Sequence, residues 1–212
     1  MNRYIKKNNI VIVGLAKNAS QSIKKLAFDY NWEIHEELND EEFEKFVDLY
    51  NPNTKIYFPL RDVIDRAKSE FLQKINDEFL GQDKIKDITE YINTQIQDRT
   101  FYPQHHYFDN CAMKFFMKNI FCNDSWNGCE YYFFDLNNLN SKFVEYIGID
   151  VIIDNKNKLT ERPNKIILNE LISKSTFKNK YCDYNFIRSA NSIQYPIFEI
   201  IKKSKQWLNL DG

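Results

Sequence analysis

The sequence predicts an α/β protein in which a mostly parallel central sheet lies between two layers of helices. Two observations lead to this prediction. Short apolar runs alternate with segments of helical spacing, and the first such runs end in polar loops. The chain has 212 residues, of which 43% are hydrophobic, and no repeat or low-complexity linker divides it. We therefore expect residues 1–212 to form one domain around one core.

The first elements are a strand, a helix and a second strand. An apolar run at residues 10–13 predicts the first strand, a short polar loop follows Gly14, and residues 21–30 have helical spacing. Residues 32–35 predict a short strand that returns to the sheet. A strand, helix, strand order implies a parallel pair with a right-handed crossover.

A capped helix start at residues 39–42 comes next, with Phe43, Phe46 and Val47 on one face of the predicted helix. Residues 51–53, which include Pro52, end it, and residues 55–60 predict the next strand. In a doubly wound sheet, ligands bind beyond the carboxyl ends of the strands. Both polar loops, after residues 13 and 60, fall there.

The remaining elements are predicted from the same patterns. Residues 83–97 predict a packed helix, residues 99–107 an irregular aromatic-rich segment, and residues 130–136 a buried strand. Residues 140–147 predict a helix leading to Gly148. Helices are expected at 164–174 and 183–203, with Pro196 interrupting the second.

Charge and hydropathy exclude several classes of protein. The 29 basic and 30 acidic residues nearly cancel, so no broad attraction to nucleic acid is expected. No apolar run approaches the roughly 20 residues of a membrane span, and Lys6 and Lys7 follow the N-terminus where a signal peptide has an apolar core. We expect a cytoplasmic protein without a membrane span.

The cysteines show neither a CxxC pair nor the histidine spacing of a zinc site, so no metal is expected. Free buried thiols are the expected state in a reducing compartment, and a bridge between Cys122 and Cys129 is the alternative. The four positions are Cys111, Cys122, Cys129 and Cys182.

Two polar segments are candidate anion sites. Arg61 follows the strand at 55–60 directly, and Ser69 stands eight residues later, so a guanidinium fork, a hydroxyl and a helix N-terminus converge. The alternative interpretation is an ordinary helix start, in which Asp62 is the cap, Asp62 pairs with Arg66, and Ser69 lies on the surface. Upstream, the loop after Gly14 also combines a lysine, two hydroxyls and a helix N-terminus. Together the segments predict a clamp for two phosphates.

The loop resembles the 5′-phosphosulfate loop of sulfotransferases, and the segment that begins at Arg61 resembles their 3′-phosphate segment. The likeness is strongest to the Golgi-type carbohydrate enzymes, particularly the heparan and dermatan 2-O-sulfotransferases. Residues 100–104 resemble a Pro-Gln element of related enzymes, and residues 158–162 a late cofactor-contacting loop. The chain departs from the family at Ala19, Gln21 and Val63 and in the short interval between the motifs.

The resemblance implies a P-loop-like three-layer α/β/α fold and the co-substrate 3′-phosphoadenosine 5′-phosphosulfate (PAPS), without a metal. The acceptor would be a glycan or a small alcohol. The implied binding residues are Lys17, Asn18, Ala19, Ser20, Gln21, Ser22, Arg61, Ser69, Thr160 and Arg162.

Sulfuryl transfer needs stabilisation of the leaving phosphate and a base for the acceptor. Lys17 is the expected stabiliser. Glu33 and His35 share one face of the predicted strand at 32–35 and are the candidate bases, since the 3-O- and N-sulfotransferases use a Glu on the corresponding strand. The 2-O enzymes use a His just before the Arg-bearing strand, where this chain has none. His105 and His106 are further candidates.

Two alternatives remain open. A P-loop kinase needs the Walker A pattern GxxxxGK followed by Ser or Thr, and residues 14–17 lack its second Gly and its final pair. A catalytically silent domain that binds the nucleotide or a glycan is the other alternative, because the expected base is not at the 2-O position.

Overall fold

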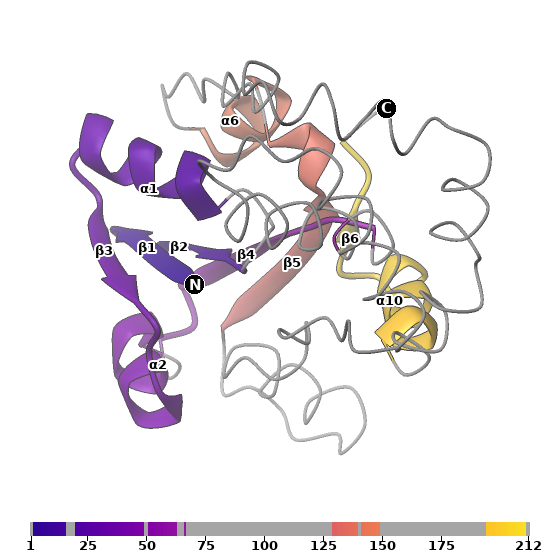
Figure 1. Ribbon diagram of the computed structural model, residues 1–212, viewed down its shortest axis with the longest axis horizontal. Coiled ribbons are helices and arrows are strands. Elements are labelled where there is room, and N and C mark those ends of the chain that lie inside the picture. The colour runs from indigo at the N-terminus through magenta and orange to yellow at the C-terminus, as the bar shows by residue number, and fades with distance from the viewer. Residues whose placement is uncertain are drawn as a thin grey trace, which may run out of the picture. The chain divides into compact units, whose positions relative to one another are not determined.

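The computed structural model describes residues 2–15, 20–48, 51–62, 66, 129–139, 141–148 and 194–210. Their central feature is a six-stranded sheet with the order β3-β1-β2-β4-β5-β6 (Figure 1). The strands are β1 Arg3–Lys7, β2 Ile10–Gly14, β3 Glu33–Glu36, β4 Lys55–Leu60, β5 Glu130–Asp135 and β6 Trp207–Leu208. The helices are α1 Ser20–Asp29, α2 Asp40–Val47, α6 Ser141–Ile147, α10 Gln194–Lys202 and the 3-10 helix η1 Leu136–Asn138.

The fold class is mixed α/β with a mostly parallel sheet. The pairs β2–β4, β4–β5 and β5–β6 are parallel, whereas β1 pairs antiparallel with both β2 and β3. The strands predicted at 10–13, 32–35, 55–60 and 130–136 are confirmed to within a residue at each end. The helices predicted at 21–30 and 140–147 are also confirmed, and α2 begins where the cap at residue 39 predicted it.

The predicted pairing of the second strand is wrong. β3 does run in the same direction as β2, but β1 lies between them and pairs with both. β1 escapes detection because its sequence RYIKK has only two adjacent apolar residues and no apolar run. It forms a hairpin with β2 across Asn8 and Asn9, where Asn8 adopts a φ of 54° that suits a tight turn.

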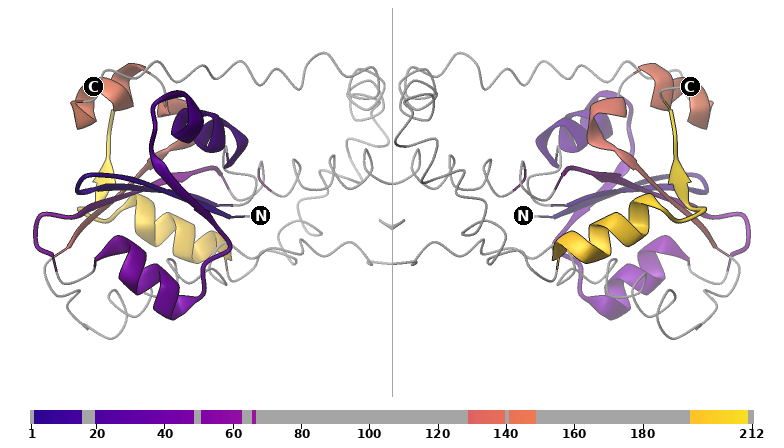
Figure 2. Two further views of the ribbon diagram at one scale, coloured as in Figure 1. Left: turned by 90° about the vertical axis from the view of Figure 1, so that its left-hand side faces the viewer. Right: turned by 90° about the vertical axis from the view of Figure 1, so that its right-hand side faces the viewer.

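Helices cover both faces of this sheet (Figures 1 and 2). α1 and α6 lie on one face, where they share a buried cluster with alternate strand residues. This cluster comprises Ile5, Ile12, Ile23, Leu26, Ala27, Trp32, Tyr57, Phe134, Leu139 and Phe143. α2 and residues 197–202 of α10 lie on the other face, where the ring of Phe43 packs on Tyr4 with a centroid distance of 5.6 Å.

Two local features set the helix ends. The Asn39 side chain accepts a hydrogen bond from the Glu42 N–H, and Glu42 accepts one from the Asn39 N–H, both at 2.9 Å, which completes a capping box for α2. Pro196 lies in the first turn of the described helix α10, and because residues 183–193 lie outside the described residues, the predicted interruption stays a prediction. A proline fits there because the first N–H groups of a helix have no intrahelical acceptor.

The chain divides into two compact units. One comprises residues 1–62, 105–157 and 197–212, and the other comprises residues 63–104 and 158–196. The whole sheet belongs to the first unit. The predicted helices at 83–97 and 164–174, the segment at 99–107 and residues 183–193 lie outside the described residues, and the single domain stays a prediction.

Candidate functional site

The candidate site lies at the edge of the sheet where the parallel strands end, which we call the carboxyl edge. Strands β2 and β4 are parallel neighbours, with Ile10 opposite Lys55 and Ile12 opposite Tyr57. The chain that leaves Gly14 and the chain that leaves Leu60 therefore emerge at one edge, beside each other. This adjacency is what the two polar segments need if they are to act on one ligand.

The first polar segment ends in the first turn of α1. Ser20 begins the helix, Ser20 and Ser22 are half-buried, and Gln21 is exposed. The first N–H groups of a helix point outward without intrahelical partners, which suits an anion. Lys17, Asn18 and Ala19 lie outside the described residues.

Gly14 brings α1 close to the end of β2. A Cβ atom at this position would lie 2.8 Å from Ile23 Cδ1 and 3.3 Å from the carbonyl oxygen of Arg3. Ile23 is completely buried, so it holds the start of α1 directly against the sheet. The absence of a side chain at residue 14 therefore fixes how closely the helix N-terminus approaches the carboxyl edge.

The second polar segment follows β4. Arg61 and Asp62 are half-buried at the carboxyl edge. Arg66 is 1% exposed, and because a buried guanidinium needs its charge compensated, this burial is compatible with the alternative in which Asp62 pairs with Arg66. Ser69, Thr160 and Arg162, and the further candidates His105 and His106, lie outside the described residues.

Glu33 and His35 share a face of β3, as expected, and His35 lies one residue before the carboxyl end of the strand. Glu33 opens the strand and pairs with Lys6, three residues before the carboxyl end, which is about 10 Å along a strand. His35 Nε2 lies 3.0 Å from Glu33 Oε1, and its ring packs on Phe46 of α2 at a centroid distance of 5.0 Å. Both side chains thus face α2, away from the sheet face that carries α1.

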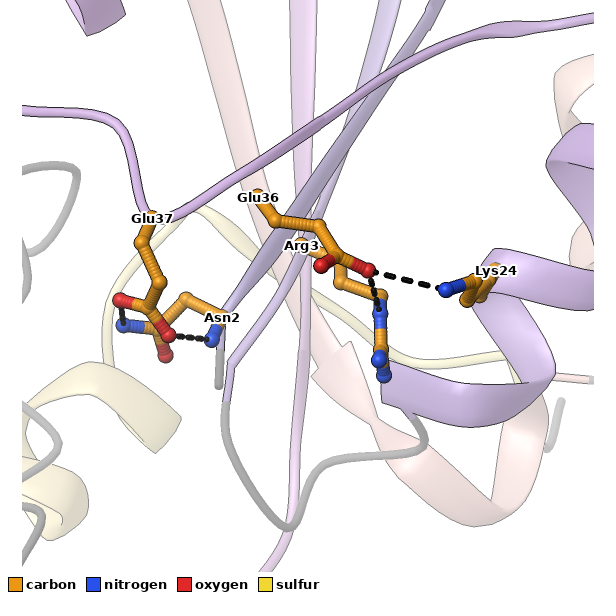
Figure 3. Close-up of polar contacts among 5 residues, drawn as sticks. All are labelled: Asn2, Arg3, Lys24, Glu36 and Glu37. Atoms are coloured by element: carbon orange, nitrogen blue, oxygen red, sulfur yellow. Dashed lines mark hydrogen bonds and ion pairs between the residues drawn. The ribbon is translucent and has the colours of Figure 1, made fainter.

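A cluster of charged side chains at the carboxyl edge was not predicted. Arg3 Nε donates a hydrogen bond to Glu36 Oε1 at 2.8 Å, and Lys24 Nζ of α1 donates to the same oxygen at 3.2 Å (Figure 3). We call Arg3, Lys24 and Glu36 the edge cluster. It joins β1, β3 and α1, and Arg3 lies opposite Gly14 in the β1–β2 pair.

Hydrogen bonds between Asn2 and Glu37 hold the start of β1 to the end of β3 beside this cluster. Asn2 donates both its backbone N–H and its side-chain amide to the Glu37 carboxylate, and the Glu37 N–H donates to the Asn2 carbonyl at 3.3 Å (Figure 3). The hydrogen bond from Arg3, and then that from Lys24, holds the pKa of Glu36 below its usual value of 4.5. Glu36 is therefore ionised at neutral pH.

The only sequence signal for this cluster is the pair of asparagines at residues 8 and 9 between two segments of extended propensity. Recognising a hairpin there places Arg3 level with Gly14, because the strands of a hairpin run antiparallel. Predicting that Glu36 belongs to this cluster would also require the β1–β3 pairing, which brings together residues that are 33 positions apart.

Among the described residues, no group of three or more His, Cys, Asp or Glu side chains is arranged to hold a metal ion. Within the same part of the chain, no helix has the length and apolar content to cross a membrane. Cys129 is a buried cysteine whose thiol is reduced, which confirms the expected state at this position, and burial raises its pKa to about 11. The alternative bridge to Cys122 is therefore not formed.

Comparison of the chain with protein-family models, with curated proteins and with solved structures gives no match.

Proposed function

We propose that the chain is a PAPS-dependent sulfotransferase that transfers the sulfuryl group to a hydroxyl or an amine of a carbohydrate or small-molecule acceptor by in-line displacement. The observation that supports this most is the parallel pairing of β2 and β4. This pairing places the N-terminus of α1, which follows β2, and Arg61, which follows β4, at one edge of a mostly parallel sheet. The proposal includes a P-loop-like three-layer architecture and a cytoplasmic location.

The proposed roles divide the ligand between the two segments. The N–H groups and hydroxyls at Ser20 and Ser22 hold the 5′-phosphate, and Lys17 stabilises the charge that grows on the leaving phosphate. Arg61 and Ser69 hold the 3′-phosphate. The half-buried position of Arg61 suits this role, because the side chain is partly desolvated and still accessible.

The remaining implied residues complete the nucleotide site. Asn18, Ala19 and Gln21 belong to the same loop and first turn, and Thr160 and Arg162 belong to the proposed late loop. Sulfuryl transfer by this scheme uses side chains and backbone N–H groups for charge stabilisation, and PAPS supplies the group that is transferred.

The proposal is tested by comparing adenine nucleotides that differ in where their phosphates are attached. We expect 3′-phosphoadenosine 5′-phosphate (PAP) to raise the melting temperature of the protein well beyond ADP or ATP at equal concentration. Only PAP carries the 3′-phosphate that Arg61 would bind, and stabilisation grows with the ratio of ligand concentration to Kd. Equal shifts, or a preference for ATP, would refute the nucleotide assignment.

A second candidate is a catalytically silent domain that binds PAPS, PAP or a glycan. The observation that favours it is the position of Glu33 and His35, which face α2 and hydrogen-bond to each other. The two candidates are separated by measuring sulfate transfer from PAPS to a panel of glycans and small alcohols. Transfer that is lost in Lys17→Ala supports the enzyme, whereas PAP binding without transfer to any acceptor supports the silent domain.

A further inference from the structure

β3 is the last described strand on its side of the sheet. The strand order places β1 on one side of it and no described strand on the other, and Figure 1 shows β3 as the outermost strand there. A strand in this position presents backbone N–H and C=O groups with which a further strand can pair. Glu33 and His35 are exposed, and Ile34 is half-buried. We call the side of β3 that faces away from β1 its outer side.

The hydrogen-bond register shows which backbone groups of β3 point to the outer side. The Glu37 N–H donates to the Asn2 carbonyl at 3.3 Å, so these two residues continue the β1–β3 register as a hydrogen-bonded pair. Hydrogen-bonded and non-hydrogen-bonded pairs alternate along an antiparallel ladder. The N–H and C=O groups of Ile34 and Glu36 therefore point outward. Within the described part of the chain, no hydrogen bond reaches these outward groups.

The segment formed by β3 and the following residues is strongly acidic. Residues 33–44 contain seven acidic residues and no lysine or arginine, although the charges of the whole chain nearly cancel. Glu33, Asp40 and Glu42 are exposed, and among the described residues they form no ion pair with a lysine or an arginine. Complementary charge across an interface selects partners, so this segment favours a basic one.

The two faces of β3 differ in character, and an added strand would meet both. Glu33 and His35 lie on the α2 face, where the His35 ring packs on Phe46. Ile34 lies on the α1 face, where it packs against the buried cluster. Successive side chains of a strand alternate between faces. An added strand complements β3 if its basic side chains lie on the α2 face and its apolar side chains lie on the α1 face.

We propose that the outer side of β3 binds a basic, extended peptide segment as an additional antiparallel strand. Backbone hydrogen bonds to Ile34 and Glu36 supply the pairing, and the acidic side chains select the partner. A second copy of the chain fits less well. In the antiparallel register in which Ile34 lies opposite Glu36 of the copy, Glu33 lies opposite Glu37, and like charges opposite each other are destabilising. This surface does not depend on the proposed function.

The probe is the peptide Lys-Val-Lys-Val-Lys with both ends blocked, added to the full chain and followed by NMR. Its valines can lie opposite Ile34 and Glu36, with their N–H and C=O groups directed at β3. We expect the peptide to slow amide hydrogen exchange at Ile34 and Glu36. Exchange at His35 should stay unchanged, because its N–H already bonds to β1 in the ladder.

Two N-methylated peptides are the matched controls for the backbone hydrogen bonds. Methylation of both valines removes the two donors that face β3 and should weaken binding by about 5- to 150-fold. Methylation of the central lysine, whose N–H points away from β3, should change the affinity by less than about 2-fold. A peptide with glutamates in place of the lysines should not bind. Glu33→Gln should weaken binding of the lysine peptide by up to about 5-fold at low salt.

Substitution of Ile34 tests the same hydrogen bonds from the protein side. Ile34→Pro removes the outward N–H and keeps the bonds to β1, since an edge strand accepts proline where the N–H faces solvent. Ile34→Ala is the matched control because it shortens the side chain and keeps the N–H. Ile34→Pro should bind the peptide about 2- to 12-fold more weakly than Ile34→Ala. If Ile34→Pro does not fold, the N-methylated peptides decide, because they test the unchanged protein.

Equal affinity of the unmodified and both N-methylated lysine peptides would mean that charge alone attracts them, and it would overturn the added strand. Unchanged exchange at Ile34 and Glu36 with the peptide in excess would overturn it as well. Equal binding of the glutamate peptide would overturn the basic partner. Sedimentation of the chain without peptide tests the second copy: a dimer that Ile34→Pro dissociates and Ile34→Ala does not would assign the outer side to that copy and overturn the proposal.

Discussion

Substitution of Gly14 by alanine tests how closely α1 is held to the carboxyl edge. The added Cβ would lie 2.8 Å from Ile23 Cδ1, whereas carbon atoms normally approach to about 3.5 to 4.0 Å, so roughly 0.7 to 1.2 Å must be absorbed. Ile23 is completely buried in a cluster that includes Ile12 and Leu26, so its methyl group is surrounded by other side chains. The free energy of unfolding should fall by about 1 to 3 kcal/mol, the usual effect of overpacking.

The assay is thermal and urea unfolding followed by circular dichroism. A loss of this size lowers the melting temperature by about 2 to 12 °C in a protein of this length. Ile23→Val removes the methyl group that the new Cβ would meet, and alone it should cost about 0.5 to 1.5 kcal/mol. The double variant should be more stable than the sum of the single effects predicts, by about 1 kcal/mol.

Gly148 supplies a control for the glycine substitution. Its φ is +68°, and in the part of the chain that the structure describes no atom lies within 4 Å of a Cβ built there, so Gly148→Ala should cost about 1 kcal/mol through backbone strain. This cost should add to that of Ile23→Val without coupling. A neutral Gly14→Ala, or strict additivity of Gly14→Ala with Ile23→Val, would refute the close packing of α1 on β2.

Three further predictions concern local features. Glu36→Gln should destabilise the protein at pH 7. The gap in urea midpoint should narrow as the pH falls below about 4.5, because the stabilisation that comes from the lowered pKa of Glu36 is complete above the unfolded pKa and is lost as the pH falls through the folded one; a pH-independent gap would contradict this. Burial raises the pKa of the Cys129 thiol to about 11, so this thiol should not react with iodoacetamide in the native protein at pH 8. Cys129→Ser should therefore leave the labelling of the native protein unchanged and reduce the labelling in urea. Lower labelling of the native variant would contradict this. Asn39→Ala should lower the free energy of unfolding, measured in urea, by about 1 kcal/mol. Asn39→Ser keeps a capping oxygen and should lower it by only a few tenths of a kcal/mol. Equal losses would argue against the capping box.

The described elements were predictable where local pattern determines them. The apolar runs of β2 and β4 and the Asn39 cap need no knowledge of distant residues. The shared edge of β2 and β4 was also expected, because strands separated by helices form parallel sheets with their carboxyl ends together.

The rest depended on pairings between distant segments. β1 enters the sheet between β2 and β3, and its short charged sequence does not reveal this position. The same insertion brings Arg3 to Glu36 and leaves Glu33 at the amino end of β3. Hydrophobic periodicity indicates which residues share a face of a strand but not which strands lie beside it. It therefore predicts that Glu33 and His35 share a face, but it does not predict the edge cluster.

A 3′-phosphate site at Arg61 is tested by the calorimetric affinity of wild type and Arg61→Ala for PAP and for adenosine 5′-phosphate, which lacks the 3′-phosphate. Wild type should bind PAP more tightly. Arg61→Ala should weaken PAP binding by about 10- to 100-fold and leave adenosine 5′-phosphate unchanged. Equal affinity of wild type for the two ligands, or an equal effect of Arg61→Ala on both, would contradict a 3′-phosphate site at the carboxyl edge.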